Sequence, residues 1–319
     1  MRYTSPERYR AMKKTVAFVH SLCLLACLVH LMPTASATNT PDAPEPVSLD
    51  GIIHPDSDDT LAFTPDGNTV FFDRSEGKHK TILISHKVSG HWSKPQVASF
   101  SGSWFDQDPV VSPDGSYLLF DSDRPVKSGS KPLLQDYFVG GLAPGSNIWG
   151  VDRKGSEWGL PVWLGPVIDN SPFVDFPSIA ADGTLYFISW SQNEKAMHIW
   201  KSQYRDGNYL PPVRVGLGDP AISTHDPAVA SDQSFIVFDY GKVKGGLGRM
   251  CIAFREGDHW GKPIDFGDVI NKDLPWGAHI GPDKHTVYFT GQSGIWRLSL
   301  EHWLGTHGSA TIPNKHKSI

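Results

Sequence analysis

Short runs of β-branched and aromatic residues recur along the chain, and each follows a turn sequence. In the clearest turn, Pro65 presets φ, the Asp66 carboxylate accepts from backbone amides ahead of it, and Gly67 allows positive φ. The equivalent turns cover residues 64–67, 112–115, 181–183, 231–233 and 281–284, and the runs that follow end at Phe72, Phe120, Phe187, Phe238 and Phe289. Apolar residues flank every turn, so the pattern predicts five β-hairpins.

Two further patterns follow each hairpin. The first predicts a third strand, which in most units carries an aromatic residue, over residues 82–84, 147–149, 198–200, 249–251 and 294–296. The second is an aromatic residue with proline three positions later, at Trp92, Trp158, Tyr209 and Trp260. Proline at the head of a strand favours an outer edge, where no backbone donor is needed. We interpret the repeated tryptophans as packing between units rather than as a cofactor site.

Four short strands in every ~50 residues are typical of propeller blades. The last unit lacks its own outer strand, but residues 46–53 resemble the outer strand at residues 161–168. We therefore predict an all-β fold, a five-bladed β-propeller over residues 45–303 that is closed by an N-terminal outer strand. Six blades are the alternative.

The repeat resembles a known family. The segment from Trp158 through Pro161 to Asp182 and Phe187, and the segment from Asp108 to Arg124, are similar to the WD-like repeat of TolB-type periplasmic propellers. The resemblance implies a propeller fold and says little about activity, since such repeats serve many functions. Gln233 and Lys284 replace the turn glycine in the last two units. The six blades and additional domain usual for TolB are not predicted here, so a TolB role is not carried over.

The first 37 residues have the pattern of an export signal. Basic residues precede an apolar run over residues 15–32, and residues 35–37 form an Ala-x-Ala cleavage site. The start is either Met1 or Met12. A retained anchor and a lipoprotein attached through Cys27 are the less favoured alternatives. We expect a periplasmic or secreted protein with no membrane span after cleavage, a flexible lead-in over residues 38–44 and a polar tail over residues 304–319.

Composition narrows the class of partner. The formal net charge is −5, and removal of the basic signal makes the chain more acidic, which argues against nucleic acid. Eleven Trp require a folded core. Of three Cys, only Cys251 lies outside the signal, so we expect a fold without internal disulfides and a buried thiol in a third strand.

The residues that enter the first strands give the candidate site, because first strands line the axis of a propeller. They are acidic, with two histidines and a tryptophan among them: Asp59, Asp108, Asp175, His225, Asp226, Trp276 and His279. Two long segments, residues 121–146 and 240–248, are expected over the same face. They contain Arg124, Asp136, Tyr137, Phe138, Lys242 and Lys244.

Each aspartate taken singly is expected to cap a loop. As a group, like charges near one axis are costly without a cation or ligand. A Ca²⁺ ion suits oxygen ligands, with Asp108 and Asp226 as the candidates, whereas the histidine spacing does not favour Zn²⁺.

We predict an exported binding or scaffold module for a protein partner or an oligosaccharide, acting as a monomer. The alternative is a glycan-acting hydrolase, because similar five-bladed glycosidases use carboxylates near the axis. Its candidate catalytic residues are Asp108, Asp175 and Asp226. The sequence has no Gly-x-Ser-x-Gly elbow.

Overall fold

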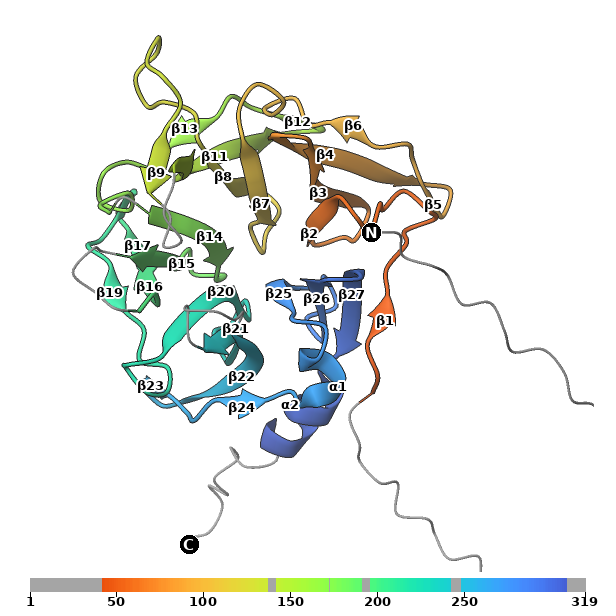
Figure 1. Ribbon diagram of the computed structural model, residues 1–319, viewed down its shortest axis with the longest axis vertical. Coiled ribbons are helices and arrows are strands. Elements are labelled where there is room, and N and C mark those ends of the chain that lie inside the picture. The colour runs from red at the N-terminus through yellow and green to blue at the C-terminus, as the bar shows by residue number, and fades with distance from the viewer. Residues whose placement is uncertain (1–41, 137–141, 172, 191–195, 242–247, 309–319) are drawn as a thin grey trace, which may run out of the picture. The chain divides into compact units, whose positions relative to one another are not determined.

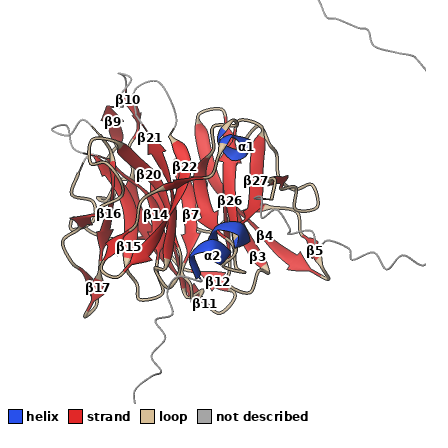
Figure 2. Cartoon of the chain, turned by 90° about the horizontal axis from the view of Figure 1, so that it is seen from below, coloured by secondary structure: helices blue, strands red, loops and turns tan. Residues whose placement is uncertain are grey.

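The computed structural model describes residues 42–136, 142–171, 173–190, 196–241 and 248–308. The predicted signal, residues 1–37, lies outside the described residues. Within them the chain forms five antiparallel sheets of four or five strands, arranged around a central axis as Figure 1 shows, and two two-stranded hairpins. Figure 2 shows the same sheets from the side, with their strands side by side. The predicted all-β, five-bladed propeller is confirmed.

Each sheet is one blade, counted from the N-terminus. Blade 1 contains β2 (Asp58–Phe63), β3 (Thr69–Glu76), β4 (His79–Val88), β5 (His91–Trp92) and β6 (Gln96–Val97). Blade 2 contains β7 (Asp106–Val111), β8 (Tyr117–Ser122), β11 (Asn147–Lys154), β12 (Glu157–Trp158) and β13 (Val162–Trp163), with the hairpin β9 (Leu134–Asp136) and β10 (Leu142–Pro144) inserted.

The other three blades repeat this plan. Blade 3 contains β14 (Phe173–Ile179), β15 (Leu185–Trp190), β16 (His198–Ser202) and β19 (Val213–Arg214), with the hairpin β17 (Tyr204–Arg205) and β18 (Asn208–Tyr209). Blade 4 contains β20 (Ser223–Val229), β21 (Phe235–Gly241), β22 (Arg249–Glu256), β23 (His259–Trp260) and β24 (Ile264–Asp265). Blade 5 contains β25 (Trp276–Ile280), β26 (Thr286–Gly291), β27 (Gly294–Ser299) and β1 (Glu45–Pro46).

The five hairpin turns share one hydrogen bond. In each, the aspartate Oδ1 accepts the backbone N–H two residues ahead, at 2.9–3.0 Å, in the pairs Asp66–Asn68, Asp114–Ser116, Asp182–Thr184, Asp232–Ser234 and Asp283–His285. Gln233 and Lys284 adopt the left-handed conformation of the glycine they replace, with φ of 59° and 64°. The turn chemistry thus sets the backbone even where glycine is missing.

The outer part of each blade differs from the expected single strand. Trp92, Trp158 and Trp260 lie in short strands that pair with the far end of the third strand, as in the register Arg153↔Trp158. The segment after each proline forms a separate two-residue strand at the blade edge, namely β6, β13, β19 and β24. The aromatic residue therefore belongs to a tight hairpin, and the proline starts the edge.

The N-terminal segment completes blade 5, as predicted, although with a short strand. Glu45 pairs with Arg297 and Pro46 with Trp296, and the Val47 N–H donates to the Ile295 carbonyl at 2.9 Å. β1 covers two residues rather than the expected run to residue 53. It still protects the exposed edge of β27.

Two helices lie at the end of the chain. Helix α1 (Asp268–Asn271) precedes blade 5, and α2 (Glu301–Gly308) follows it. Trp303 of α2 is buried against Phe266, with ring centroids 4.5 Å apart. Helix α2 continues to Gly308, into the segment that was expected as a polar tail. Within the described ranges, no helix has the length and apolar character needed to cross a membrane.

Candidate axial site

Every first strand is bent at the same position. Thr60, Asp108, Phe176, Asp226 and Gly277 have positive φ of 39°, 50°, 52°, 47° and 63°. Each coincides with a break in the register between the first and second strands of its blade. A left-handed residue at such a bulge re-aims the neighbouring side chains, and for residues other than glycine it costs free energy that the surroundings must offset.

Hydrogen bonds between blades hold several of these bulges. Asp73 of β3 accepts the backbone N–H of Asp108 in blade 2, with Oδ2 2.9 Å from the nitrogen. Asp121 of β8 accepts the N–H of Phe176 in blade 3 at 2.8 Å. From blade 5 to blade 1, the Thr290 hydroxyl accepts the Thr60 N–H at 3.3 Å. Each bond ties the second strand of one blade to the strained residue of the next.

Blade 4 uses a different link. The Asp226 carboxylate, on the bulge itself, accepts the Gly277 N–H of blade 5 at 3.1 Å. Asp239, the residue of blade 4 that corresponds to Asp73 and Asp121, interacts instead with Asp226.

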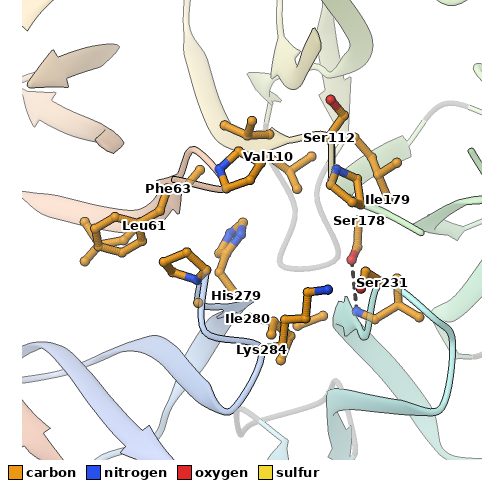
Figure 3. Close-up of a pocket in the computed structure, with 18 residues that line it drawn as sticks. Leu61, Phe63, Val110, Ser112, Ser178, Ile179, Ser231, His279, Ile280 and Lys284 are labelled. Atoms are coloured by element: carbon orange, nitrogen blue, oxygen red, sulfur yellow. Dashed lines mark hydrogen bonds between the residues drawn. The ribbon is translucent and has the colours of Figure 1, made fainter. Parts of the chain in front are cut away.

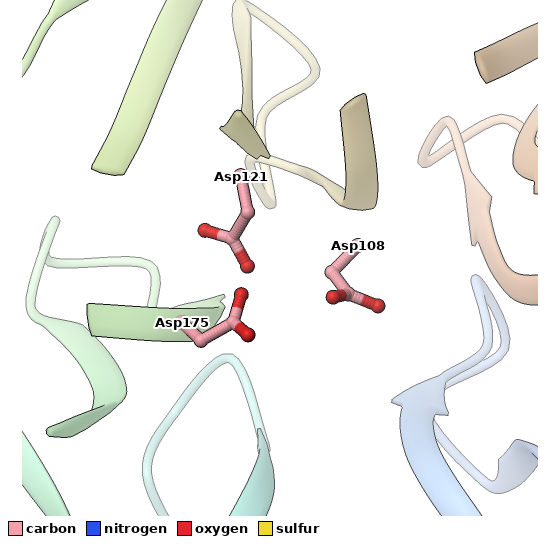
Figure 4. Close-up of side chains that lie close together, drawn as sticks. All are labelled: Asp108, Asp121 and Asp175. Atoms are coloured by element: carbon pink, nitrogen blue, oxygen red, sulfur yellow. The ribbon is translucent and has the colours of Figure 1, made fainter. Parts of the chain in front are cut away.

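Three carboxyl groups meet where blades 2 and 3 approach the axis (Figure 4). Asp108, Asp121 and Asp175 each offer one oxygen within 4.8 Å of the others, and all three side chains are buried, at 3%, 0% and 2% exposure. Asp175 accepts from the Ser146 hydroxyl at 3.2 Å. Asp108 Oδ2 and Asp121 Oδ1 have no hydrogen-bond partner.

Burial dominates the electrostatics of this group. It raises the pKa of Asp108 well above the usual range, and the charges of Asp175, Asp73 and Asp226 raise it further, against an opposing effect of Lys80. Burial and the neighbouring Asp175 likewise raise the pKa of Asp121. For Asp226, burial raises the pKa to about 7. The site therefore resists holding its full negative charge without a compensating cation.

Lys80 supplies part of that compensation. Its ammonium lies 3.0 Å from Asp59 and 3.6 Å from Asp73. Burial alone would lower the pKa of Lys80, but the carboxylates of Asp73, Asp108 and Asp59 raise it above its usual value. Among the ion pairs of the described residues, none involves Asp108, Asp121, Asp175 or Asp226.

The other predicted site residues are divided between the two ends of the axis. His225 precedes the Asp226 bulge, and burial lowers the pKa of its imidazole to about 4. Trp276 precedes the Gly277 bulge and is partly buried. His279 lies beyond the bulge and lines a different space.

That space is a cavity of about 110 Å³ on the turn side of the axis (Figure 3). Apolar residues such as Leu61, Val110 and Ile179 line it together with His279 and Lys284. Burial lowers the pKa of His279 to about 4. Residues from the ends of the first strands thus line the axis on the side away from the carboxyl groups.

Loop capping, expected of the axial aspartates, falls mainly to other residues. Asp58 accepts the His54 N–H at 2.8 Å and Asp123 the Phe105 N–H at 2.8 Å. Of the two long segments, Arg124 is buried and donates to Asp106 at 2.6 Å, so it supports the blade. Tyr137, Phe138, Lys242 and Lys244 lie outside the described residues, as does the side chain of Asp136.

Sequence reasoning missed the carboxylates of the second strands, and Lys80. Asp73, Asp121 and Asp239 each directly follow the phenylalanine that ends a repeated run. The sequence therefore contains a signal for these carboxylates, namely an aspartate one position after the repeated phenylalanine. Lys80 lies on β4 with no equivalent spacing in other blades, so only the fold brings it to the axis.

No family model matches the sequence, and no curated protein sequence matches it. Solved structures do match, at low identity. A protein assigned as TolB from Agrobacterium tumefaciens is 16% identical, with 74% of this chain and 70% of that chain covered and a TM-score of 0.47. TolB from Acinetobacter baumannii is 14% identical over 76% of this chain, with a TM-score of 0.46, and this chain spans 54% of its length. A thermostable family-43 glycoside hydrolase is 11% identical over 76% of this chain and 88% of that chain, with a TM-score of 0.50. These likenesses concern the fold.

Proposed function

We propose that this chain is an exported binding module whose axial site is organised by a divalent cation. Asp108, Asp121 and Asp175 would hold the ion, and Ca²⁺ fits a donor set made of carboxylate oxygens. The observation that carries the proposal is the pair of buried oxygens, Asp108 Oδ2 and Asp121 Oδ1, that have no hydrogen-bond partner. Buried polar atoms are normally satisfied, and a cation would satisfy both.

The ligand would be polar, either an oligosaccharide or a segment of a protein partner, held over the mouth of the axis. Asp59, Asp175 and His225 each directly precede the bulge of their first strand, and we infer that they face this end. A rigid ring that carries these groups is suited to binding without large movement. A bound cation would lower the cost of the clustered negative charge and fix the carboxylates. Periplasmic or secreted localisation belongs to the same proposal.

A glycan-acting hydrolase is the rival. It would use the raised pKa of Asp226 for a general acid, with Asp108 or Asp175 as the second carboxylate. Burial argues against it, because Asp108, Asp175 and Asp226 are at most 7% exposed and a glycosidic bond needs direct access to both catalytic carboxyl groups.

Thermal unfolding of the chelator-treated protein tests the proposal. Addition of Ca²⁺ is expected to raise the unfolding temperature. At a free Ca²⁺ concentration of a hundred times Kd, the free energy of unfolding should increase by about 2.7 kcal/mol. Asp121→Asn should remove most of this shift while an amide oxygen still accepts the Phe176 N–H. Asp232→Asn, a turn aspartate of blade 4, is the matched control and should keep the full shift.

Two results would contradict the proposal. An unfolding temperature that does not respond to Ca²⁺, Mg²⁺ or Mn²⁺ would remove the cation. Turnover of a glycan that is lost with Asp108→Asn or Asp226→Asn, without loss of fold, would favour the hydrolase instead.

A further inference from the structure

The outer hairpins of blades 1, 2 and 4 carry the same cross-strand pair. A basic side chain lies over an indole ring, with its charged group 5.5 Å from the centroid for Lys87 over Trp92, 5.9 Å for Arg153 over Trp158 and 5.2 Å for Arg255 over Trp260. Such cation–π pairs are attractive, and they present a flat aromatic face to the next element.

This pair fills the gap to the preceding blade. Trp158 of blade 2 packs edge-on against Phe71 of blade 1, with ring centroids 5.1 Å apart. Trp260 of blade 4 packs in one buried cluster with Tyr186 of blade 3. Arg153 also interacts electrostatically with Asp66, the turn carboxylate of blade 1. The indole of Trp158 thus fills the gap between blades 1 and 2, and the positive charge of Arg153 balances the Asp66 carboxylate at the edge of that gap.

Blade 3 breaks the pattern. Its hairpin pairs Tyr204 with Tyr209, where the other blades have a basic residue and tryptophan, and the two rings are 5.0 Å apart. The residue of blade 2 that corresponds to Phe71 and Tyr186 is Leu119. Leu119 is thus smaller than Phe71 and Tyr186, and Tyr209 is smaller than the tryptophan that the other hairpins carry at its position.

The result is a groove of about 660 Å³ between blades 2 and 3, on the turn face. Four aromatic side chains line it, namely Tyr117, Trp163, Tyr204 and Tyr209, and Tyr204 is 49% exposed. The neighbouring outer segment of blade 2 also leaves Val162 67% exposed. A contiguous apolar surface of this kind is typical of a binding groove.

The charge of the groove is one-sided. Asp114 and Asp152 line it, and its lining, taken over the described residues, contains no Lys, Arg or His. Asp114 is the turn carboxylate that corresponds to Asp66, which has Arg153 across its gap. Across the gap from Asp114, Tyr204 occupies the position of Arg153 in the repeat.

We propose that this groove binds an extended peptide segment of a protein partner that presents a large aromatic side chain beside an Arg or Lys. In blades 1, 2 and 4 the chain itself provides an indole ring and a cation at this place, and here the partner would provide both. Its ring would lie against Tyr204 and Tyr209, and its cation near Asp114. The proposal does not depend on the axial cation, since the groove lies in a different part of the propeller.

Fluorescence anisotropy with a labelled peptide, Gly-Arg-Ser-Trp-Gly, tests the groove in the intact protein. Saturable binding is expected below about 1 mM. The double variant Tyr204→Arg/Tyr209→Trp restores the pair of the other blades, and should weaken binding at least about tenfold because it fills the groove. Asp114→Asn should weaken binding about two- to fivefold, with less dependence on salt. Asp232→Asn, the matched turn carboxylate of blade 4, should leave binding unchanged.

The filled variant also carries its own check on folding. It should unfold at the same temperature as the parent or higher, because the restored pair packs as it does in the other blades. A second variant, Tyr204→Ala, removes an exposed aromatic ring from the groove without changing the core and should also weaken peptide binding.

Several outcomes overturn the proposal. They are a parent protein that does not bind the peptide, binding that survives both variants, and equal binding of a peptide with Ala in place of Trp. An uncharged oligosaccharide that binds in the groove, while the peptide does not, would assign the groove to a glycan instead.

Discussion

At the scale of single residues, the aspartates of this propeller fall into distinct structural classes. Asp66 and its equivalents fix the hairpin turns through a local hydrogen bond. Asp73 and Asp121 reach across a blade boundary to a strained backbone N–H. Asp108 and Asp175 face the axis beside them. The same residue type thus sets a turn, a contact between blades and a candidate cation site, and its position in the blade decides which.

Asp73→Ala should destabilise the fold by about 3 kcal/mol, because it leaves the Asp108 N–H and the Thr60 hydroxyl without their buried acceptor. It also removes one carboxylate from Lys80. Urea unfolding measures the effect. Asp73→Asn keeps an acceptor oxygen and should cost less. Equal losses for both variants would show that charge, rather than the hydrogen bond, is what matters.

The sequence allowed only part of the axial group to be predicted. Asp108, Asp175 and Asp226 were expected at strand entries, and the structure places them near the axis. Asp121 was not expected there, because it lies on a second strand. It joins the group by accepting the backbone N–H of Phe176, at the bulge of the next blade, and that contact is tertiary. His279 was expected at the mouth but lines the cavity at the other end, since the bulge separates it from Trp276.

At the scale of elements, the inner hairpin of each blade could be predicted from the sequence, and the arrangement of its outer strands could not. The hairpins follow from turn chemistry and alternating apolar residues, both of which are local. The division of the outer segment into a tight hairpin and a two-residue edge strand depends on where the tryptophan packs, which is a tertiary contact. Helix α2 is held by burial of Trp303, which is likewise set by the neighbouring blade.

The attachment of β1 is an element whose strength can be measured. Val47→Pro removes the N–H that donates to the Ile295 carbonyl and should destabilise the protein by about 1–2 kcal/mol. Val47→Ala keeps that N–H and is the control for lost packing. Chemical denaturation of both variants separates the two effects. If Val47→Pro costs no more than Val47→Ala, the hydrogen bond does not secure the closing strand.

At the scale of the whole molecule, buried acids make stability depend on pH. Burial raises the pKa of Asp169 to about 7, although it accepts N–H bonds from Ile148 and Trp163. An unfolded aspartate has a pKa of about 4. Between these values the folded state binds more protons than the unfolded state, so the free energy of unfolding falls as pH rises from about 4 to 7.

Asp169→Asn should remove this part of the pH dependence, which amounts to roughly 2–4 kcal/mol across the window. Unfolding at pH 4, 5.5 and 7 in the parent and the variant gives the comparison. Because Asn is neutral at every pH, as the protonated carboxyl group is, the variant should match the parent most closely at pH 4 and gain stability relative to it towards pH 7. A constant difference at all three values would mean that Asp169 does not titrate in this range.

The closing contact of blade 5 also constrains the order of folding. Glu45 and Arg297 are 252 positions apart, so the segment around Glu45 is synthesised before the rest of the propeller and can pair with β27 only after nearly all of it has been made. Contacts this distant in sequence form late, because the entropy of closing a long loop opposes them until the rest of the structure exists. Until then β27 has a free edge, open to pairing with another chain. Pairing of β27 with another chain therefore competes with the closure of the ring. Because β1 spans only two residues, few hydrogen bonds favour closure over that competing contact.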